Sequence, residues 1–355
     1  MNGFPRRPRQ SDPVRDNDHR RSPRPPGGGI SLLAVRVLLF TGLVLALFPA
    51  FRAGAQDHPK ITQTGLTNGE FTLRFTSPSG FNSRLERSAN LVDWSAVYTF
   101  PRTAASQLHT DTGARFASRL FYRIVQLPET NALTGDHIPT TEGDLVVHPV
   151  NHASLVMSWK DQIIYADPVG GADLYKNLPK PTLIFVTDIH PDHADSVTIN
   201  GIGGANAVLV VPPAVLPMLS SGLAAVSRVM ANGATLSVAG LGVEAIPMYN
   251  LTPARLQYHT KGRGNGYILT LGGKRVYLSG DTEDIQEMRN LQNIDLAFLC
   301  MNLPYTMDIN QAANVTRVFR PRRVVPYHYS DSNVTQFKQL VGRDLNIEVL
   351  LRKWY

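Results

Sequence analysis

Cysteine is almost absent from this sequence of 355 residues, which contains only Cys300. A single cysteine excludes an intrachain disulfide, so the chain is not a small scaffold stapled by disulfides. Charged residues are also few, at 18% of the chain, whereas apolar residues make up 43%. This length and apolar content leave room for two domains and a sizeable core. Cys300 lies in the apolar run 296–300, where we expect a small core residue and not a nucleophile.

Excess positive charge is missing from most of the chain, although the formal net charge is +7. Residues 1–55 contain nine arginines and three aspartates, which gives a net charge of +6. The other 300 residues carry 26 basic and 25 acidic side chains, so their net charge is only +1. Nothing after residue 55 indicates a polyanionic partner, and we therefore expect no nucleic-acid binding.

The first 55 residues have the features of an export signal. Residues 1–29 are rich in arginine, proline and glycine, a composition that cannot bury a core. The apolar stretch 37–48 and an Ala-Gly-Ala run ending at Ala55 follow, so we expect a secretory signal cleaved after Ala55. An uncleaved membrane anchor is the alternative, although Arg36 interrupts the apolar span. We predict export to a bacterial periplasm or beyond, with membrane contact only through this segment.

Residues 56–128 are predicted to form a small all-β sandwich module. Short runs of alternating apolar and polar residues are separated by clusters of Gly, Pro, Asn and Ser. The stretch Ser88–Trp94, followed by Phe121-Tyr-Arg123, resembles fibronectin-like modules of secreted bacterial proteins. We expect the indole of this stretch to fill the core between two sheets. Residues 129–142 are polar and contain turn residues, and we interpret them as a linker.

From residue 143 onward, strand-like runs alternate with helical ones, which predicts an α/β domain over residues 143–355. Two sheets flanked by helices follow most simply from this alternation, with loops at one edge carrying the chemistry. The expected strands are 146–150, 155–159, 163–167, 183–186, 207–211, 243–248, 267–271, 275–278, 296–300, 323–326 and 347–351. The expected helices are 213–220, 284–291, 308–319 and 333–341, with Asp308 as an N-cap.

The stretch Thr187–Asp195 contains four side chains that can bind metal ions, namely Asp188, His190, Asp192 and His193. An apolar run precedes it directly, which indicates a buried strand that delivers these side chains at its carboxyl end. Carboxylate and imidazole groups on such a strand end can hold two metal ions close together. A polar loop with two solvated histidines is the alternative for this stretch taken alone.

Two further side chains follow predicted strands in the same way. Asp281 comes directly after strand 275–278, and His328 follows Val324-Val-Pro-Tyr327. Taken singly, each has an ordinary explanation, as a turn residue or as a surface histidine. Taken together, we expect them to close the site that Asp188–His193 begins.

These features resemble the metallo-β-lactamase fold superfamily over roughly residues 143–355. The matching segments are Asn151-His152-Ala-Ser154, Ala166-Asp-Pro168, Asp188-x-His-x-Asp-His193, Gly280-Asp-Thr282 and His328. The most similar branch contains ascorbate-6-phosphate lactonases and N-acyl-phosphatidylethanolamine phospholipase D. The resemblance implies an αββα sandwich with two divalent metal ions, zinc first, at one edge of the sheets. It also implies Asp192, His193 and His328 on one ion, with Asp281 bridging to the other.

The sequence departs from the superfamily pattern at the other ion. Asp188 stands where the family has histidine, and a carboxylate still binds zinc but suits manganese or iron better. Where the family has another histidine, this chain has Asn250, which is a poor zinc ligand. His259 can replace it as a ligand. Alternatively, His259 contacts the substrate, with Lys261 and Arg263 as an anion-binding lip.

Three residues are assigned to the reaction itself. The resemblance places His152 near the metals, where it contacts substrate or hydrogen-bonds a neighbouring carboxylate such as Asp167. Asp192 can orient the attacking water or relay a proton. Tyr305 can hydrogen-bond the substrate, with a core aromatic as the alternative.

The expected function is that of an exported hydrolase in which a metal-bound hydroxide attacks an ester, lactone, amide or phosphodiester. We expect a small-molecule or lipid-like substrate. A non-hydrolytic metal protein, either an iron redox enzyme or a secreted binding module, is the alternative that Asp188 motivates. A true β-lactamase shares the scaffold but fits less well, because the histidine set of the first ion is incomplete. Loop shapes set the substrate in such folds, so the sequence does not name it.

Overall fold

The structure is a computed structural model, and it describes residues 36–39, 58–102, 106–128 and 133–355. The predicted export signal, residues 1–55, lies outside these residues except for β1 (Arg36–Leu39). Among the described residues, no helix is both long and apolar enough to span a lipid bilayer. The export signal and its cleavage after Ala55 therefore stay predictions.

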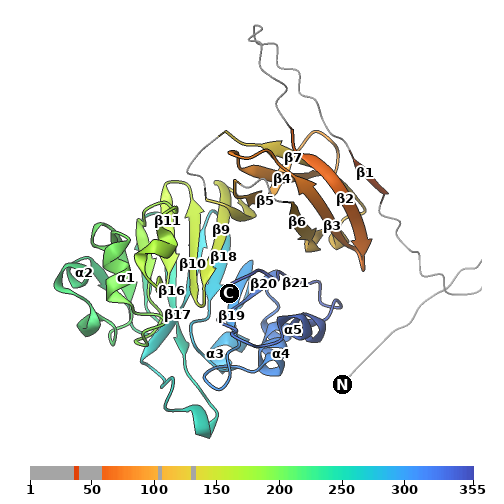
Figure 1. The fold of residues 1–355 in the computed structure, drawn as a ribbon. Helices are drawn as coiled ribbons and strands as arrows, with labels where there is room; N and C mark the ends of the chain where they lie inside the picture. Colours follow the sequence, from red (N-terminus) through yellow and green to blue (C-terminus); the bar gives the residue numbers. More distant parts are fainter. Residues whose placement is uncertain (1–35, 40–57, 103–105, 129–132) are drawn as a thin grey trace, which may run out of the picture. The chain divides into compact units, whose positions relative to one another are not determined.

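Two mixed β-sheets form the centre of residues 133–355 (Figure 1). Strands are antiparallel at one side of each sheet and parallel at the other, from β11 to β14 and from β18 to β21. Along the first sheet lie β8 (Gly135–Thr140), β9 (Gly143–Asn151), β10 (Ser154–Trp159), β11 (Gln162–Ala166), β12 (Leu183–Phe185), β13 (Val208–Val211) and β14 (Ser227–Val229). Along the second lie β15 (Thr235–Val238), β16 (Leu241–Met248), β17 (Gly264–Leu271), β18 (Lys274–Leu278), β19 (Leu296–Cys300), β20 (Arg323–Tyr327) and β21 (Glu348–Val349).

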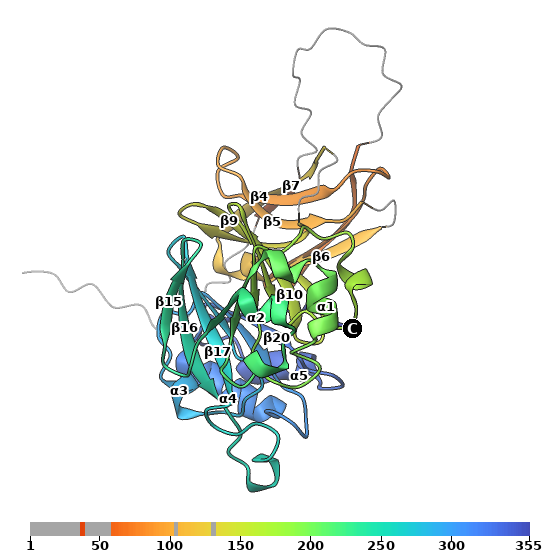
Figure 2. The same cartoon turned by 90° about the vertical axis from the view of Figure 1, so that its left-hand side faces the viewer.

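Helices lie on the outer side of each sheet (Figures 1 and 2). They are α1 (Ser196–Gly201), α2 (Ser221–Ala225), α3 (Gln286–Arg289), α4 (Ile309–Phe319) and α5 (Val334–Val341). Single turns of 3₁₀-helix complete the connections, at η2 (Ala172–Tyr175), η3 (Gly204–Asn206), η4 (Leu216–Met218) and η5 (Pro253–Arg255). The layers are therefore helix, sheet, sheet and helix, and the predicted αββα sandwich is confirmed.

Strand β12 shows why this sequence needs covered sheets. Leu183 and Phe185 belong to the core that both sheets share, whereas Ile184 and Val186 belong to the core under α1 and α2. All four side chains are completely buried. A strand that is buried on both faces requires a continuous apolar run, and that run is what precedes the metal-binding motif.

The long helix α4 begins and ends where the sequence predicts. Asp308 is its N-cap and accepts hydrogen bonds from the backbone N–H groups of Asn310 and Gln311. The Gln311 side chain in turn accepts a hydrogen bond from the N–H of Asp308, which completes a capping box. The helix predicted over 213–220 is wrong: only η4 forms there, because Pro217 cannot donate the hydrogen bond that a continued α-helix needs.

Residues 58–128 form short strands, as predicted. These are β2 (Lys60–Thr67), β3 (Glu70–Thr76), β4 (Ser83–Ser88), β5 (Ser95–Phe100), β6 (Gln107–Asp111) and β7 (Arg119–Gln126), with η1 (Thr112–Phe116) before the last. Phe71, Leu73 and Phe75 alternate into their core. Trp94 does not fill that core, contrary to the prediction, but lies half-buried under the Arg123 guanidinium, 4.2 Å from it. The kinship with fibronectin-like modules stays a prediction.

The segment 129–142 is more ordered than a linker over part of its length. Gly135–Thr140 form β8, which pairs antiparallel with β9 from Asp136–Val147 to Thr140–Gly143. The glycine that suggested a turn has a φ of 134°, and a Cβ on it would lie 1.9 Å from the Val147 carbonyl oxygen. Close approach of two backbones, and not a turn, is thus the reason for glycine at position 135.

Candidate metal centre

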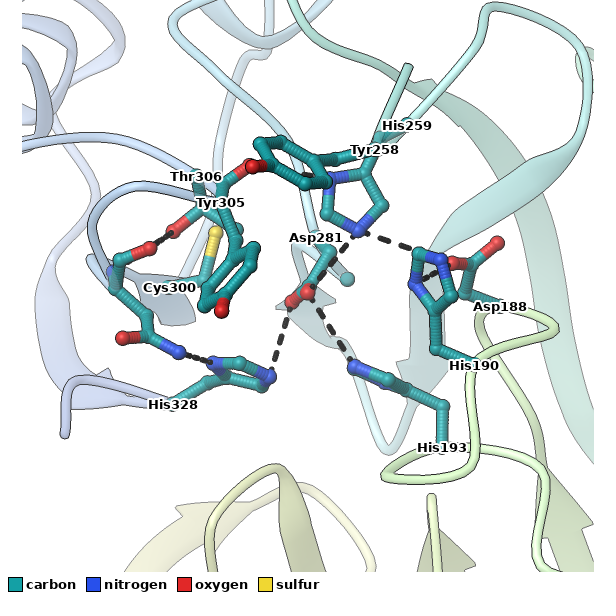
Figure 3. A network of polar contacts seen from close by, with 12 residues as sticks. Asp188, His190, His193, Tyr258, His259, Asp281, Cys300, Tyr305, Thr306 and His328 are labelled. Atoms are coloured by element: carbon teal, nitrogen blue, oxygen red, sulfur yellow. Dashed lines mark hydrogen bonds and ion pairs between the residues drawn. The ribbon is translucent and has the colours of Figure 1, made fainter. Parts of the chain in front are cut away.

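Seven carboxylate and imidazole side chains from four loops converge at one edge of the sheets, and Figure 3 shows six of them, all but Asp192. We define the first cluster as Asp188, His190 and His259. We define the second cluster as Asp192, His193 and His328, because Asp192 Oδ2 lies 3.9 Å from His193 Nε2 and 3.4 Å from His328 Nε2. Asp281 lies between the two clusters. The structure thus brings together all seven residues that the sequence proposed as metal ligands, although their binding of metal stays a prediction.

Asp281 is the hub of the centre, and three histidines point at it (Figure 3). Its Oδ2 lies 3.4 Å from His193 Nε2 and 3.3 Å from His259 Nε2. Its Oδ1 lies 3.4 Å from His328 Nε2. These distances exceed those of ordinary hydrogen bonds to a carboxylate, so they leave room for an ion between the nitrogen and oxygen atoms.

Asp167 fixes the orientation of His193 from behind. Its Oδ2 accepts a hydrogen bond from His193 Nδ1 at 2.9 Å and one from the Thr187 hydroxyl at 2.7 Å. Its Oδ1 accepts the backbone N–H of Thr187 at 2.8 Å. Because Nδ1 donates a hydrogen bond to Asp167, Nε2 is the ring nitrogen of His193 that faces the centre.

His152 supports the second cluster and contacts Asp192, not Asp167 as the sequence suggested. Its Nε2 donates to Asp192 Oδ2 at 2.9 Å, and its Nδ1 lies 2.9 Å from the hydroxyl of Tyr355. Its ring lies against that of His328, tilted by 44°, with 3.7 Å between centroids. Burial raises the pKa of Asp192, but the hydrogen bond from His152 and the nearby imidazole of His328 outweigh it and lower that pKa. His152 therefore holds Asp192 ionised and oriented.

The first cluster is completed by His259. The Nε2 of His259 lies 3.8 Å from Asp188 Oδ2, and the same oxygen lies 2.8 Å from His190 Nδ1. The Nδ1 of His259 hydrogen-bonds the carbonyl oxygen of Tyr305 at 3.2 Å, which leaves Nε2 free toward the centre. Asn250 is turned away, because its side-chain amide donates to the carbonyls of Arg255 and Tyr305. Of the two candidates that the sequence left open, only His259 reaches the cluster.

The alternative of an anion-binding lip gains no support, because neither Lys261 nor Arg263 lines the pocket. Lys261 Nζ pairs with Glu287 at 2.8 Å, on the surface and away from the centre. Arg263 turns inward and holds Asp188 with two bonds, Nε to Oδ1 at 3.0 Å and Nη2 to Oδ2 at 2.8 Å. Burial raises the pKa of Asp188, but the hydrogen bonds from His190 and Arg263 prevail and lower it. Arg263 is therefore engaged by Asp188, and Lys261 lies on the surface outside the pocket.

Four buried atoms of the centre have no hydrogen-bond partner: Nε2 of His193, Nε2 of His259, Nε2 of His328 and Oδ1 of Asp281. Buried polar atoms are normally satisfied, and each unpaired one costs about 1–3 kcal/mol. All four are aimed at the same small space. Imidazole nitrogens and carboxylate oxygens in such a space suit divalent ions such as zinc, so the residues present fit a two-ion site.

The pKa values of the centre show how strongly it attracts positive charge. Burial would raise the pKa of Asp281, but the charges of His328 and His193 hold it well below its usual range. Burial would lower the pKa of His193, but Asp281 and Asp167 raise it well above its usual range. In each case a neighbouring charge overcomes desolvation, which is the behaviour of a site that holds protons or a cation.

A pocket of about 350 Å³ opens onto both clusters. Besides the centre itself, it is lined by His152, Pro191, Tyr258, Asn302 and Tyr305. The two tyrosine rings meet edge to face at 5.0 Å. No lysine or arginine is among its lining residues, and the side chain of Tyr305 is partly exposed to it.

Cys300 lies beneath the centre and does not face the pocket. It is completely buried, and its thiol contacts the backbone of Thr282 at 3.4 and 3.5 Å. Burial raises the pKa of this thiol to about 12. The prediction of a core residue instead of a nucleophile is confirmed.

Sequence reasoning missed the partners of the ligands. Arg263 was assigned to substrate, and the roles of Tyr258 and Tyr355 were not foreseen. One signal was available for Arg263: a buried aspartate in place of a neutral histidine requires a compensating cation nearby. No comparable signal existed for Tyr355, which reaches His152 from 203 positions away.

Comparisons with known proteins cover the region that holds the centre. The family model of the beta-lactamase superfamily domain matches residues 147–328. The UPF0173 metal-dependent hydrolase of Pyrobaculum islandicum is 31% identical over 198 residues, which are 52% of this chain and 83% of that protein. That of Pyrococcus abyssi is 29% identical over 178 residues, or 47% of this chain and 77% of that protein. A crystal structure of a candidate metal-dependent hydrolase from Parabacteroides distasonis is 36% identical, with a TM-score of 0.58, over 63% of this chain and all of that one.

Proposed function

The chain belongs to the metallo-β-lactamase superfamily and is a metal-dependent hydrolase, and we propose that it cleaves an uncharged carboxylic ester or lactone. One observation carries the proposal: the centre of seven carboxylate and imidazole side chains, four of whose buried atoms are unpaired, adjoins a pocket whose lining contains no lysine or arginine. Hydrolysis of a neutral carbonyl compound needs the metal centre but no cationic subsite. A phosphodiester is the second candidate, because two divalent ions alone can bind its charge.

The two clusters would each hold one ion, with Asp281 shared between them. Two divalent ions, zinc first and manganese or iron as alternatives, supply a Lewis acid and an activated water when bound. Asp192 then lies at the floor of the pocket with 45% of its side chain exposed, where it can orient the nucleophile. His152 keeps that carboxylate ionised through its 2.9 Å hydrogen bond.

The pocket walls would hold the rest of the substrate. Tyr258 and Tyr305 present aromatic surface, and the Tyr305 hydroxyl can donate to a carbonyl or leaving-group oxygen. Asn302 adds an amide on the side of His328, 3.4 Å from its Nδ1. This combination of aromatic walls with a few polar groups suits a small-molecule or lipid-like ester better than a highly charged one.

To test this proposal, the purified full-length protein is offered a p-nitrophenyl ester, a lactone and bis-p-nitrophenyl phosphate, and hydrolysis of each is measured. We expect ester or lactone turnover that disappears on chelation and returns when zinc or manganese is added. Preference for the phosphodiester would replace the substrate class, and turnover that chelation leaves intact would reject the proposal. The iron redox alternative requires visible absorption in protein purified without added metal.

The basic and apolar character of residues 1–55 supports export as part of the proposed function. Expressed in a bacterium, the protein should appear in the periplasmic fraction or the medium with a mass that corresponds to a chain starting at residue 56. Retention of the full mass in the membrane fraction would favour the anchor, and full mass in the cytoplasm would contradict export.

A further inference from the structure

We propose that Arg263 makes the two clusters bind metal unequally, so that the second cluster loads first and tightly and the first cluster loads second and loosely. The inference rests on the proposed two-ion hydrolase, but it concerns binding and not turnover. It assigns Arg263 a role as an internal competitor for the carboxylate of Asp188.

The first cluster already contains a positive charge without any ion. Asp188 is completely buried, yet both of its oxygens are satisfied by the planar fork of Arg263, at 3.0 and 2.8 Å. Arg263 Nη2 also lies 3.5 Å from His190 Nε2 and donates to the carbonyl oxygen of Tyr258. A guanidinium is a planar cation whose fork matches the two oxygens of a carboxylate.

The backbone holds Arg263 in this place. The adjacent strand residue Asn265 donates its N–H to the carbonyl oxygen of Thr187 at 2.9 Å, which ties β17 to the residue before Asp188. Gly264 permits that approach, since a Cβ there would lie 2.7 Å from the Thr187 oxygen and 2.6 Å from the Met248 side chain. The pair is therefore part of the fold and not a chance contact of two surface side chains.

The second cluster contains no arginine or lysine. Nε2 of His193, Nε2 of His328 and Oδ1 of the shared Asp281 are buried and unpaired, and His152 hydrogen-bonds Asp192. An ion that enters here satisfies three unpaired atoms at once. In the first cluster an ion gains only one unpaired atom, His259 Nε2, and must share Asp188 with a fixed positive charge close by.

The experiment is a zinc titration of the full-length protein after its metal has been removed by dialysis against a chelator. Calorimetry and elemental analysis of the dialysed samples give the number of ions and their dissociation constants, without any substrate. For the wild type we expect two ions whose dissociation constants differ by about 100-fold or more. His259→Ala should abolish only the weaker ion, which assigns it to the first cluster.

Arg263→Met is the decisive variant, because it removes the charge and keeps much of the volume. We expect the weaker ion to bind at least about tenfold more tightly and the tighter ion to be unchanged. Lys261→Met is the matched control, since it removes one positive charge from the same loop where Lys261 contacts Glu287 and not Asp188. It should leave both constants at their wild-type values.

Two results would overturn the proposal: equal affinities in the wild type, or weaker binding by the first cluster in Arg263→Met. The second would mean that Arg263 positions Asp188 as a ligand instead of competing for it. If circular dichroism shows that Arg263→Met is unfolded, Arg263→Lys takes its place and must keep the affinities at least about tenfold apart. Unequal dissociation constants without ester or lactone turnover would reject the proposed function alone. Turnover with equal dissociation constants would reject this inference alone.

Discussion

The two clusters of the metal centre contain the same kinds of side chain, yet their surroundings differ. In the second cluster, the supports are a carboxylate behind His193 and an imidazole beside Asp192, and they leave the inward atoms unpaired. In the first cluster, the support is the cation Arg263, which already satisfies Asp188. On the proposal above, the groups around the candidate ligands decide how well each cluster binds an ion. They leave the atoms of the second cluster unpaired, but they pair Asp188 of the first cluster with a guanidinium.

The largest effect should come from the residue that both clusters share. Asp281→Asn removes the charge that His193, His259 and His328 surround, so both clusters lose their common ligand. We expect kcat/KM to fall by about 10³-fold or more and at least one ion to be lost. Steady-state kinetics and elemental analysis measure both, with Asp344→Asn, an exposed carboxylate paired to Arg317, as control. Two retained ions and near-normal turnover would remove Asp281 from the centre.

The next effect sharpens the difference between the clusters. His328→Ala should lower the affinity of the tighter ion by at least about 100-fold, since it deletes a ligand of the cluster that has no internal cation. His259→Ala should leave that ion in place. Competition with a chelator of known affinity measures the tighter site in each variant. Equal losses in the two variants would mean that the clusters are equivalent.

A smaller effect is expected where the change lies one step behind a ligand. Asp167→Asn keeps the size of the side chain but removes the charge that orients His193. Changes of this type typically cost 10- to 100-fold in metal affinity, so we expect about that loss in the second cluster. The first cluster should be unaffected. A loss confined to the weaker ion would contradict the assignment of Asp167 to the second cluster.

The smallest effect should follow from Tyr355→Phe. This change deletes only the hydroxyl next to His152 Nδ1, which also accepts the backbone N–H of Ser330 at 3.1 Å. One neutral hydrogen bond corresponds to about a two- to tenfold change, and we expect it in kcat and not in metal content. Tyr329→Phe serves as control, because it deletes a hydroxyl that donates to the backbone carbonyl of Arg352 at 3.3 Å and not to His152. A loss of metal in Tyr355→Phe would indicate a structural role.

The sequence predicts the fold, and which side chains gather at the candidate metal centre, because both depend on local patterns. The run 183–186 predicts a strand that is covered on both faces, and the motif that follows it carries four of the seven ligands. What the sequence does not predict are contacts between distant segments. The sequence does not decide whether Asn250 or His259 points at the first cluster. In the structure, Asn250 is turned away by its hydrogen bonds to two backbone carbonyls.

Trp94 and Arg263 illustrate the same limit. A large aromatic in a β-module is ordinarily a core residue, but here the ring lies under Arg123 because that guanidinium offers it a cation–π contact. Arg263 looks like a substrate-binding residue in a glycine-rich loop, but β17 begins one residue later and turns it inward. In both cases the partner lies far along the chain, and no periodicity in the sequence announces it.

Cys300 has a practical consequence for work on this protein. Its sulfur is buried near Asp281, and the thiol hardly ionises at neutral pH. Reagents that label thiols should therefore react only after the loops around the metal centre have opened. Because the chain has one cysteine, the labelling rate reports a single place without any engineered probe. Comparing the labelling rate of metal-loaded and metal-free protein would show how strongly bound ions keep these loops closed.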